Sequence, residues 1–499
     1  MNTIAIIGGG FAGTLTAVNL IRQCRYAVKI VLIESQQKAG RGMAYSTLSE
    51  KHLLNVPAGR MSAFPDKPLH FLRWAQSQDK KVKESSFLKR SLYGEYLESI
   101  LQSTLKELPH GVAFERIFDE ALSIKLIQGD SKAVIKLAEG DVVVADRAVL
   151  ATGNFSPAIP TGISQGIASS DKYINNPWGT HSFDFGTTSG DILLIGSGLT
   201  MVDKALEIVH SGFKGTIHAV SRRGLLPRAN SRTSHPAFAQ TELHSELFGD
   251  LHLLVKSVRE AIKSGSYGQL FDNASTVKMD VSDWRQVIDS LRPHSQSLWQ
   301  SLDDKQKRRF LRHVRAYWDV HRHRTAPEVG EEIDALVGAG KLQVTAGRLY
   351  SVQETADALI ATILPREGKQ AQQVKVSYMI NCTGVSADFR RVKNPLAQSL
   401  LTRGIVSPHA SGLGINVLPE GNVVDAQGKA SNVVFTLGTP TLGTRGETTA
   451  IPELRVQAKD LAAKLLSTAR PALEISITDE ISRSGSFTTQ DFLKFNVKA

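Results

Sequence analysis

Glycines and one acid near the N-terminus are spaced for holding a phosphate. Gly8, Gly10 and Gly13 follow the β-branched run at residues 3–7, and Glu34 ends the next such run. In this order the first glycine makes a tight turn, the second lets the backbone approach a pyrophosphate, and the third lets a helix pack closely on a strand. The carboxylate of Glu34 would accept hydrogen bonds from a ribose. The spacing predicts a dinucleotide-binding unit rather than an ordinary glycine-rich turn. The expected ligand contacts are Gly8, Gly10, Phe11, Ala12, Gly13 and Glu34.

A second unit of the same kind stands in the middle of the chain, and it ends in the opposite charge. Its turn is the Gly-Ser-Gly at residues 196–198, a helix is predicted at 199–209, and Arg222 and Arg223 occupy the place of Glu34. An acid there repels a phosphate, whereas an arginine suits a ribose 2′-phosphate through charge-assisted hydrogen bonds. We therefore predict roughly a 10-fold to 100-fold preference for NADPH over NADH. The expected contacts are Gly196, Gly198, Leu199, Thr200, Arg222 and Arg223.

The third fingerprint position of this second unit is Met201, where glycine or alanine is usual. The bulk of Met201 is expected to push the helix away from the strand or to change how a pyrophosphate sits. A structural strand-helix-strand unit without a ligand is the alternative for this part of the chain.

Four further motifs accompany the two units. Residues 40–45 read GRGMAY and residues 53–62 read LLNVPAGRMS, with the glycine, proline and asparagine punctuation and the few acids of a phosphate-facing loop. A plain surface loop is the alternative here. Strands ending in Thr-Gly are expected at 147–153 and 374–384. A strand within 432–438 leads toward a helix that begins near residue 451.

With these motifs the chain resembles the two-dinucleotide-binding flavoproteins. Within them it is most similar to a bacterial branch of FAD/NAD(P)-binding proteins related to class B and N-hydroxylating flavin monooxygenases, from residue 1 to about residue 465. The resemblance implies an α/β fold of two nested Rossmann-type dinucleotide-binding domains with a mostly helical insertion. The anchors place the FAD domain at 1–165 and 375–470, the NADPH domain at 187–227 and 326–370, the insertion at 228–325, and a polar tail at 471–499.

The same resemblance implies how the motifs meet the flavin. The loop and strand after the ribose-binding acid lie along FAD toward the isoalloxazine ring. The Thr-Gly turns lie where the chain crosses between the domains. The last helix points its N-terminus at the flavin, where it would stabilise negative charge on the reduced ring. The implied FAD contacts are Arg41, Asn55, Val56, Thr152, Gly153, Gly384, Gly438, Glu447, Thr448 and Thr449.

The predicted insertion ends in a strongly basic helix. Residues 305–324 hold eight Lys or Arg and one acid, Asp319. The face formed by Phe310, Val314, Tyr317, Trp318 and His321 has helical spacing and is expected to pack. Such a helix suits phosphates, but the nearer anion is the coenzyme, so nucleic acid is not the favoured partner.

The end of the basic helix, Asp-Val-His-Arg-His-Arg at residues 319–324, resembles a motif of the same family branch. A His and Arg pair at a cleft between domains would position substrate or stabilise charge, and His321 is the candidate. A structural cluster that fastens the insertion is the equal alternative. No third and fourth ligand accompany the two histidines at standard spacing, so no metal site is expected.

Composition bounds the remaining possibilities. At roughly 100–200 residues per domain, 499 residues predict two to four domains, and the net charge of +11 favours an anionic ligand. The two cysteines, Cys24 and Cys382, cannot build a disulfide framework, and a reducing, cytoplasmic setting is the default. No apolar run of about 18 residues occurs, so no membrane span is expected, and the glycine-interrupted start argues against a signal peptide. A homo-oligomer stays open.

The favoured hypothesis is an NADPH-dependent flavoprotein monooxygenase. Reduced FAD would react with molecular oxygen, and a C4a-peroxyflavin would oxygenate a small nucleophilic substrate, with an amine favoured because the motif typical of ketone oxidation is missing after Gly153. Candidate catalytic residues are Asn55, Trp178 and His321. A flavin-dependent dehydrogenase or reductase with an acceptor other than oxygen is the first alternative, and the missing C-x-x-C excludes its disulfide-reductase form. A flavin-bound interaction protein that uses the basic helix is the second.

Overall fold

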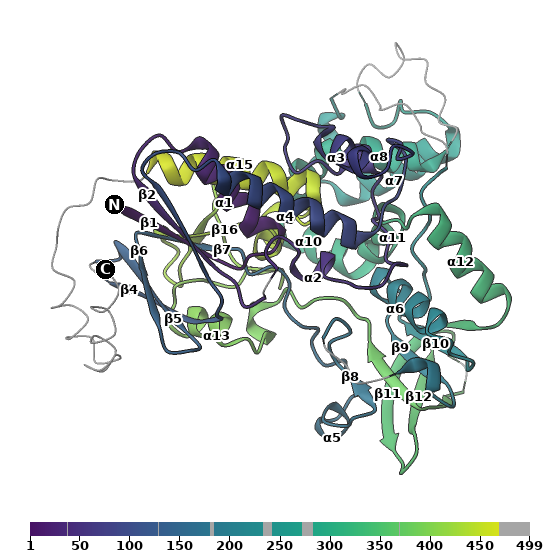
Figure 1. Ribbon diagram of the computed structural model, residues 1–499. Helices are drawn as coiled ribbons and strands as arrows, with labels where there is room; N and C mark the ends of the chain where they lie inside the picture. The colour runs from purple at the N-terminus through teal and green to yellow at the C-terminus, as the bar shows by residue number, and fades with distance from the viewer. Residues whose placement is uncertain are drawn as a thin grey trace.

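The computed structural model describes residues 1–36, 38–127, 129–179, 184–232, 242–271, 283–368 and 370–468. The polar tail predicted at 471–499 lies outside these ranges. Within them the chain forms two separate sheets built around parallel strands and a group of helices (Figure 1). None of the helices in the described ranges combines the length and apolarity that crossing a membrane requires.

The first sheet combines strands from the start of the chain with strands from near the end of its described part. Its order is β15-β16-β7-β1-β2-β3, and β1 runs parallel to both β2 and β7. β16 returns from residues 430–436 to lie parallel to β7, so the first sheet is completed only near the end of the described chain. The strands are β1 (Asn2–Ile7), β2 (Val28–Ile33), β3 (Val112–Ile117), β7 (Arg147–Leu150), β15 (Asn422–Val424) and β16 (Ala430–Thr436).

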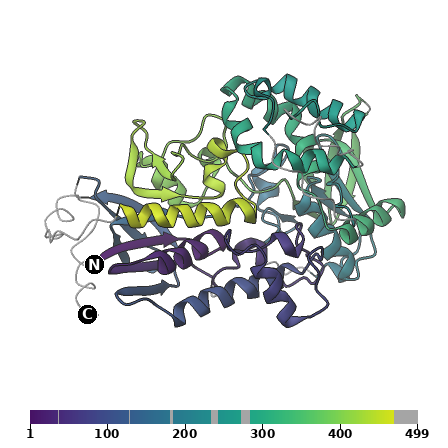
Figure 2. The same ribbon diagram turned by 90° about the horizontal axis from the view of Figure 1, so that it is seen from above.

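Alternating side chains of β1 supply two cores. Ile4 and Ile6 belong to the core under the helices, whereas Ala5 and Ile7 belong to the core on the opposite face, because successive strand residues point to opposite sides. On the helical face α1 and α15 lie side by side (Figure 2), and the Tyr26 hydroxyl donates to the Leu466 carbonyl at 2.6 Å. The helices of this domain are α1 (Phe11–Gln23), α2 (Gly42–Tyr45), α3 (His70–Gln78), α4 (Arg90–Lys106), α14 (Leu442–Arg445) and α15 (Ile451–Ser467).

The opposite face is covered by a small antiparallel sheet and one helix. The sheet has the order β4-β5-β6, and its apolar residues share a core with the helix. These elements are β4 (Ala121–Ile127), β5 (Lys132–Leu137), β6 (Val142–Ala145) and α13 (Pro395–Thr402).

The second sheet contains the second predicted unit. Its order is β13-β12-β11-β10-β9-β14-β8, with β9 parallel to β10 and β14. All four residues of β9 are buried, as expected for a strand that lies between two parallel neighbours. The elements are α5 (Gln165–Ala168), β8 (Tyr173–Ile174), β9 (Ile192–Ile195), α6 (Leu199–His210), β10 (Ile217–Ser221), α12 (Pro327–Gly338), β11 (Leu342–Glu354), β12 (Leu359–Pro365), β13 (Gln372–Val376) and β14 (Tyr378–Asn381).

The strand predicted over 374–380 is wrong in one respect, because it is two strands. β13 pairs antiparallel with β12, and β14 pairs parallel with β9. Between them the Ser377 amide donates to the Asp191 carbonyl at 2.8 Å, which turns the chain from one neighbour to the other. Residues 375–381 therefore belong to the second sheet, and the return to the first domain lies after Asn381 rather than at 375.

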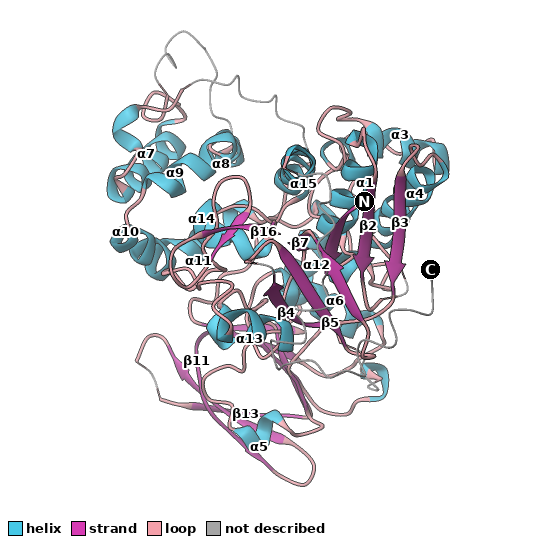
Figure 3. Ribbon diagram, turned by 90° about the vertical axis from the view of Figure 1, so that its left-hand side faces the viewer, coloured by secondary structure: helices cyan, strands magenta, loops and turns pink. Residues whose placement is uncertain are grey.

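The insertion is helical, as predicted, in the residues that the structure describes. Figure 3 shows its helices gathered on one side of the molecule, with the long strands of the first sheet on the other. The basic helix is interrupted by a π-helical turn, Phe310–Val314, a feature that often accompanies functional sites. The helices are α7 (Leu251–Ser264), α8 (Trp284–Ser290), α9 (Ser295–Ser301), α10 (Asp304–Arg309) and α11 (Arg315–Arg322).

Candidate functional site

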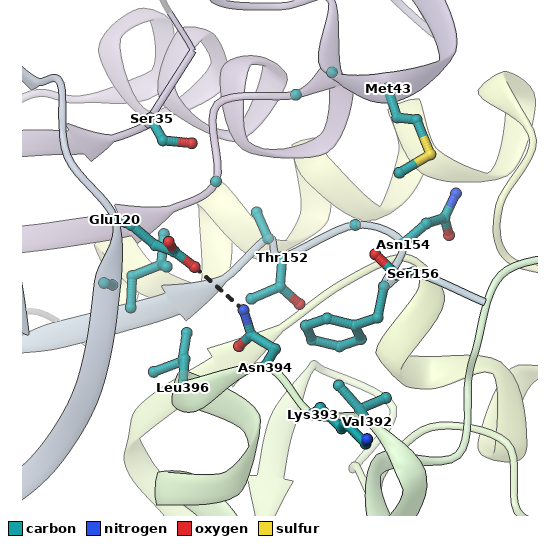
Figure 4. A pocket seen from close by; sticks show the side chains of 18 of the residues that line it. Ser35, Met43, Glu120, Thr152, Asn154, Ser156, Val392, Lys393, Asn394 and Leu396 are labelled. Carbon is teal, nitrogen blue, oxygen red and sulfur yellow. Dashed lines mark hydrogen bonds between the residues drawn. The ribbon is translucent and has the colours of Figure 1, made fainter. Parts of the chain in front are cut away.

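A cleft of about 1200 Å³ opens where β1, β2 and β7 end. The residues that follow these strands line it, including Gly8, Glu34 and Thr152, and Figure 4 shows the Thr152 side chain within the cleft. Ligands of open α/β sheets bind at this place, outside the carboxyl ends of the strands. The volume suits a ligand larger than a mononucleotide.

The glycine turn has no room for side chains. Gly8 has φ +102°, and a Cβ at this residue would lie 2.3 Å from the Ala151 carbonyl oxygen. A Cβ at Gly13 would lie 1.8 Å from the Gly8 carbonyl oxygen. The predicted tight turn and close helix packing are therefore confirmed. Gly10 caps the N-terminus of α1, which Phe11 and Ala12 begin, and it lines the cleft.

The predicted ribose-binding acid lies beside this turn. The Gly9 amide donates to Glu34 Oε2 at 2.7 Å, and the Gln36 amide donates to Oε1 at 2.9 Å. The Ser35 hydroxyl also donates to Oε1 at 3.4 Å, whereas Oε2 keeps a second lone pair that can accept a hydrogen bond from a ligand hydroxyl. The backbone bonds fix the direction of the carboxylate before any ligand arrives.

The Thr-Gly turn after β7 leaves a hydroxyl unused. Thr152 Oγ1 is buried and has no hydrogen-bond partner among the residues that the structure describes. A buried hydroxyl left unpaired costs about 1–3 kcal/mol, and a polar ligand in the cleft would remove that cost. Gly153 has φ +61°, and a Cβ there would meet nothing within 4 Å. The glycine cradle, the oriented acid and the unpaired hydroxyl together fit an FAD molecule with its adenosine end at Glu34 and its pyrophosphate along the turn.

The far wall of the cleft comes from residues that the sequence pattern did not indicate. Asn394 Nδ2 donates to Glu120 Oε1 at 3.3 Å across the cleft (Figure 4). Arg391 and Lys393 are exposed at the rim. Their neighbour Arg390 is already paired with Asp388 at 2.8 Å. The basic run at residues 390–393, separated from the second Thr-Gly turn by residues 385–389, was the one available signal.

The three residues of segments 40–45 and 53–62 that were predicted to contact the flavin do not line this cleft. Arg41 is only 8% exposed and binds both carboxylate oxygens of Glu98 at 2.8 and 3.1 Å. The Asn55 carbonyl accepts a hydrogen bond from Asn230 Nδ2 at 3.1 Å, and Val56 packs against the helical core. The Arg41 guanidinium is thus held by α4, and the two residues that follow it, Gly42 and Met43, line the cleft.

The C-terminal segment has the predicted form, with a strand ending at Thr436 and a helix beginning at Ile451. Two of its candidate contact residues, Glu447 and Thr448, already form hydrogen bonds to other side chains. Glu447 accepts from Trp318 Nε1 at 3.0 Å and from Arg322 Nη2 at 2.8 Å, so it fastens the insertion. The Thr448 hydroxyl is buried between Thr441 and Gln457, whereas Thr449 is exposed. Gly438 and Gly384 have φ of +73° and +91°, conformations that favour glycine.

The second glycine turn repeats part of the first. Gly196 has φ +115°, and a Cβ there would lie 2.4 Å from the Cys382 carbonyl oxygen, as Gly8 meets Ala151. Gly198 caps α6 with open space beside it, and Leu199 and Thr200 are half-buried at the start of the helix. Met201 is fully buried in the core of the second sheet. Because a Cβ at the matching Gly13 of the first unit would overlap the turn, Met201 cannot repeat the packing of Gly13 against its glycine turn.

The two arginines after β10 face different surroundings. Arg222 is exposed. Arg223 donates to the Tyr317 hydroxyl at 3.0 Å and to the carbonyls of Arg312 and His313 at 3.3 and 3.2 Å. The basic helix therefore lies against the end of β10, and of the two predicted phosphate ligands only Arg222 has a guanidinium without a hydrogen bond or ion pair to the described residues.

The candidate catalytic residues lie in separate surroundings. The Trp178 ring lies 5.1 Å beneath Lys204 Nζ and edge-on to His52. His321 Nδ1 lies 2.7 Å from the Tyr317 carbonyl oxygen, and the ring contacts Trp284. Among the described residues Asn55 forms no hydrogen bond to Trp178 or His321. Its hydrogen bond to the insertion is the one that its carbonyl accepts from Asn230. The packing of Tyr317 expected from helical spacing is wrong, since this side chain is 42% exposed.

Comparisons with known proteins agree with this geometry. Residues 5–155 match the FAD-NAD(P)-binding family model, whereas no curated protein matches the chain. The ornithine N-hydroxylase of Kutzneria sp. 744, solved with reduced FAD, NADP+ and L-ornithine, has 14% identity and a TM-score of 0.55 over 93% of this chain and 98% of that one. The reduced ornithine hydroxylase of Pseudomonas aeruginosa has 12% identity and a TM-score of 0.59 over 94% and 99%.

A different kind of enzyme shares the same architecture. The bacillithiol disulfide reductase of Staphylococcus aureus has 14% identity and a TM-score of 0.51 over 94% of this chain and all (100%) of that one. At such identities the likeness concerns the fold, and it confirms the predicted α/β architecture of nested dinucleotide-binding units. The chain is thus built on an FAD-NAD(P)-binding domain, matched over residues 5–155, within the fold that flavin-dependent N-hydroxylases and disulfide reductases share.

Proposed function

We propose that the protein is an NADPH-dependent, FAD-containing monooxygenase that acts on a small nucleophilic substrate of the amine type. The observation that carries the proposal is the cleft in which a side-chain-free glycine turn, the oriented Glu34 carboxylate and the unpaired Thr152 hydroxyl converge. The shared fold with ornithine hydroxylases supports the reaction class.

When bound, FAD would accept a hydride from NADPH and activate molecular oxygen. The residues of the chain would bind the cofactor, orient it and exclude water from the site. Gly8 and Gly10 present the backbone to the pyrophosphate, and Glu34 accepts from the adenosine ribose. The N-terminus of α15 would stabilise negative charge on the ring, because the first amides of a helix have no partner within it.

The insertion would close the reacting end of this site. Trp299 Nε1 donates to the Gly443 carbonyl at 2.8 Å, and Arg292 binds Glu453 at 3.0 Å. With the Arg322–Glu447 pair at 2.8 Å, these contacts hold the insertion on the segment that precedes and begins α15. Substrate would enter between the insertion and the first domain, where exclusion of water favours oxygen transfer over release of peroxide.

Anaerobic stopped-flow spectroscopy tests the proposal. NADPH should bleach the flavin band, and mixing with oxygen should then consume an amine substrate with little free peroxide. Oxygen consumption uncoupled from every amine in a library, together with reduction of another acceptor, would replace the proposal with the reductase alternative. Failure of NADPH to bleach the flavin would leave both without support.

A disulfide-reducing version of that alternative conflicts with the two cysteines. Cys24 and Cys382 are both buried. Burial raises the pKa of the Cys382 thiol well above its usual value, which disfavours the thiolate that disulfide exchange needs. The interaction-protein alternative also loses cations, because Arg315, Arg322 and Arg324 of the basic helix are paired with acids.

A further inference from the structure

The insertion meets the second dinucleotide-binding unit at the end of β10. There the Ser197 hydroxyl, from the glycine turn, donates to the Leu225 carbonyl oxygen at 2.6 Å and accepts from the Ser221 hydroxyl, whose Oγ lies 2.7 Å away. The Gly224 amide donates to Ser221 Oγ at 3.0 Å. The glycine turn and the loop after β10 are therefore one pinned structure, and the adenosine end of a dinucleotide belongs beside it, at the ends of β9 and β10.

Arg223 extends from this loop toward the insertion rather than toward the glycine turn. Its guanidinium lies 4.8 Å from the centre of the Tyr317 ring and donates to the Tyr317 hydroxyl and to two backbone carbonyls of the π-helical turn, those of Arg312 and His313. Carbonyls in a π-helical turn are less regularly paired than those of an α-helix, so they are available to a forked donor. Arg223 is thereby committed to holding the helix.

The consequence concerns Arg312. Its carbonyl oxygen lies 3.3 Å from Arg223 Nη2, so its backbone stands beside the loop, and its side chain is exposed. No acid occurs from Lys305 to Arg312. Arg222, one residue before Arg223, is exposed on the same loop. Arg222 of the second unit and Arg312 of the insertion thus lie on two segments that meet at the end of β10, and both side chains are exposed.

We propose that the 2′-phosphate of NADPH is bound by Arg222 together with Arg312 of the insertion, and that Arg223 is a positioning residue that sets the place of Arg312. The inference rests on the proposed use of NADPH and deepens it, because it assigns coenzyme selection to two domains at once. Coenzyme binding then also tightens the insertion against the second sheet, since the phosphate bridges both.

Calorimetric titration with 2′,5′-ADP and with 5′-ADP tests the assignment without any reaction. Arg222→Ala and Arg312→Ala should each weaken binding of 2′,5′-ADP about tenfold and leave 5′-ADP unchanged, because each removes one charge-assisted bond to the extra phosphate. Arg309→Ala is the matched control, since it removes an exposed arginine from the same basic segment. It should change 2′,5′-ADP binding less than about twofold.

Arg223→Lys separates positioning from direct binding. Lysine keeps the charge but lacks the fork that reaches Tyr317 and two carbonyls together. It should lose 2′,5′-ADP affinity as fully as Arg223→Ala does. Retained affinity would make Arg223 a direct ligand and overturn its assigned role.

Equal losses for Arg312→Ala and Arg309→Ala would overturn the role of Arg312 and leave the proposed NADPH dependence standing. A wild-type protein that binds both nucleotides equally would overturn that dependence and this inference together.

Discussion

The Arg90 guanidinium on α4 binds both carboxylate oxygens of Asp203 on α6, at 2.7 and 3.0 Å. α4 packs in the core of the first sheet and α6 in the core of the second, so this ion pair joins the two domains directly. Its side chains are 12% and 10% exposed. The imidazole of His52 adds a contact of 3.1 Å to the Asp203 carbonyl oxygen. The helix that follows the second glycine turn is therefore fixed relative to the FAD cleft.

Removal of one partner from this pair should destabilise the protein strongly. Arg90→Ala leaves the Asp203 carboxylate buried without its counter-charge, at a cost of about 3–5 kcal/mol in the free energy of unfolding. Lys89→Ala is the matched control, because Lys89 pairs with Glu50 in solvent and such pairs contribute about 0–1 kcal/mol. Urea unfolding measures both. Similar midpoints for the two variants would contradict a joining role for the pair.

Much of the FAD cleft was predictable because its determinants are local. The glycine turn, the strand before it and Glu34 lie within one strand-helix-strand unit, where spacing alone dictates geometry. β2 ends directly before Glu34 and β7 begins at Arg147, as predicted, because polar residues bound these apolar runs. The start of α15 at Ile451 follows from the same kind of signal, a proline in the first helical turn.

The rest of the site depends on contacts between residues far apart in the sequence, which no local sequence pattern predicts. Glu447 was predicted to approach the flavin, but it accepts from Arg322, 125 residues away. Asn394 meets Glu120 across 274 residues. Arg222 and Arg223 look equivalent in the sequence, and only the packing of the basic helix distinguishes them. Side-chain direction at such positions is set by tertiary contacts, so residue type and spacing were insufficient.

Glycine substitutions should separate close packing from backbone freedom. Gly13→Ala places a Cβ 1.8 Å from the Gly8 carbonyl oxygen, so α1 must shift, at about 1–3 kcal/mol and with loss of bound FAD. Gly338→Ala, in α12, places its Cβ in open space and should stabilise by about 0.4–1 kcal/mol. Thermal unfolding and the ratio of flavin to protein absorbance report the two effects. A Gly13→Ala protein with full flavin content would contradict the proposal that the glycine turn holds the pyrophosphate of FAD.

Thr152→Val should affect the cofactor and not the fold. Because Thr152 Oγ1 has no partner among the described residues, its loss breaks no bond in the apoprotein, and the free energy of unfolding should stay the same or rise. FAD affinity should fall about 5-fold to 10-fold if the hydroxyl bonds the cofactor. Fluorescence titration of the apoprotein with FAD measures this. Thr439→Val is the contrast, since its hydroxyl donates to Asn154 at 2.7 Å and its loss should lower stability.

His52 should make stability depend on pH. Burial lowers its pKa below the usual 6.5, although the nearby carboxylates of Asp203 and Glu207 oppose the shift and Arg90 reinforces it. The unfolded chain therefore binds a proton that the folded chain does not, so stability is complete above pH 6.5 and falls as pH drops from 6.5 toward the lower folded pKa. His52→Gln cannot take up that proton. Urea unfolding across this range should show a shallower decline for His52→Gln than for the wild type, and parallel curves would exclude His52 as the source.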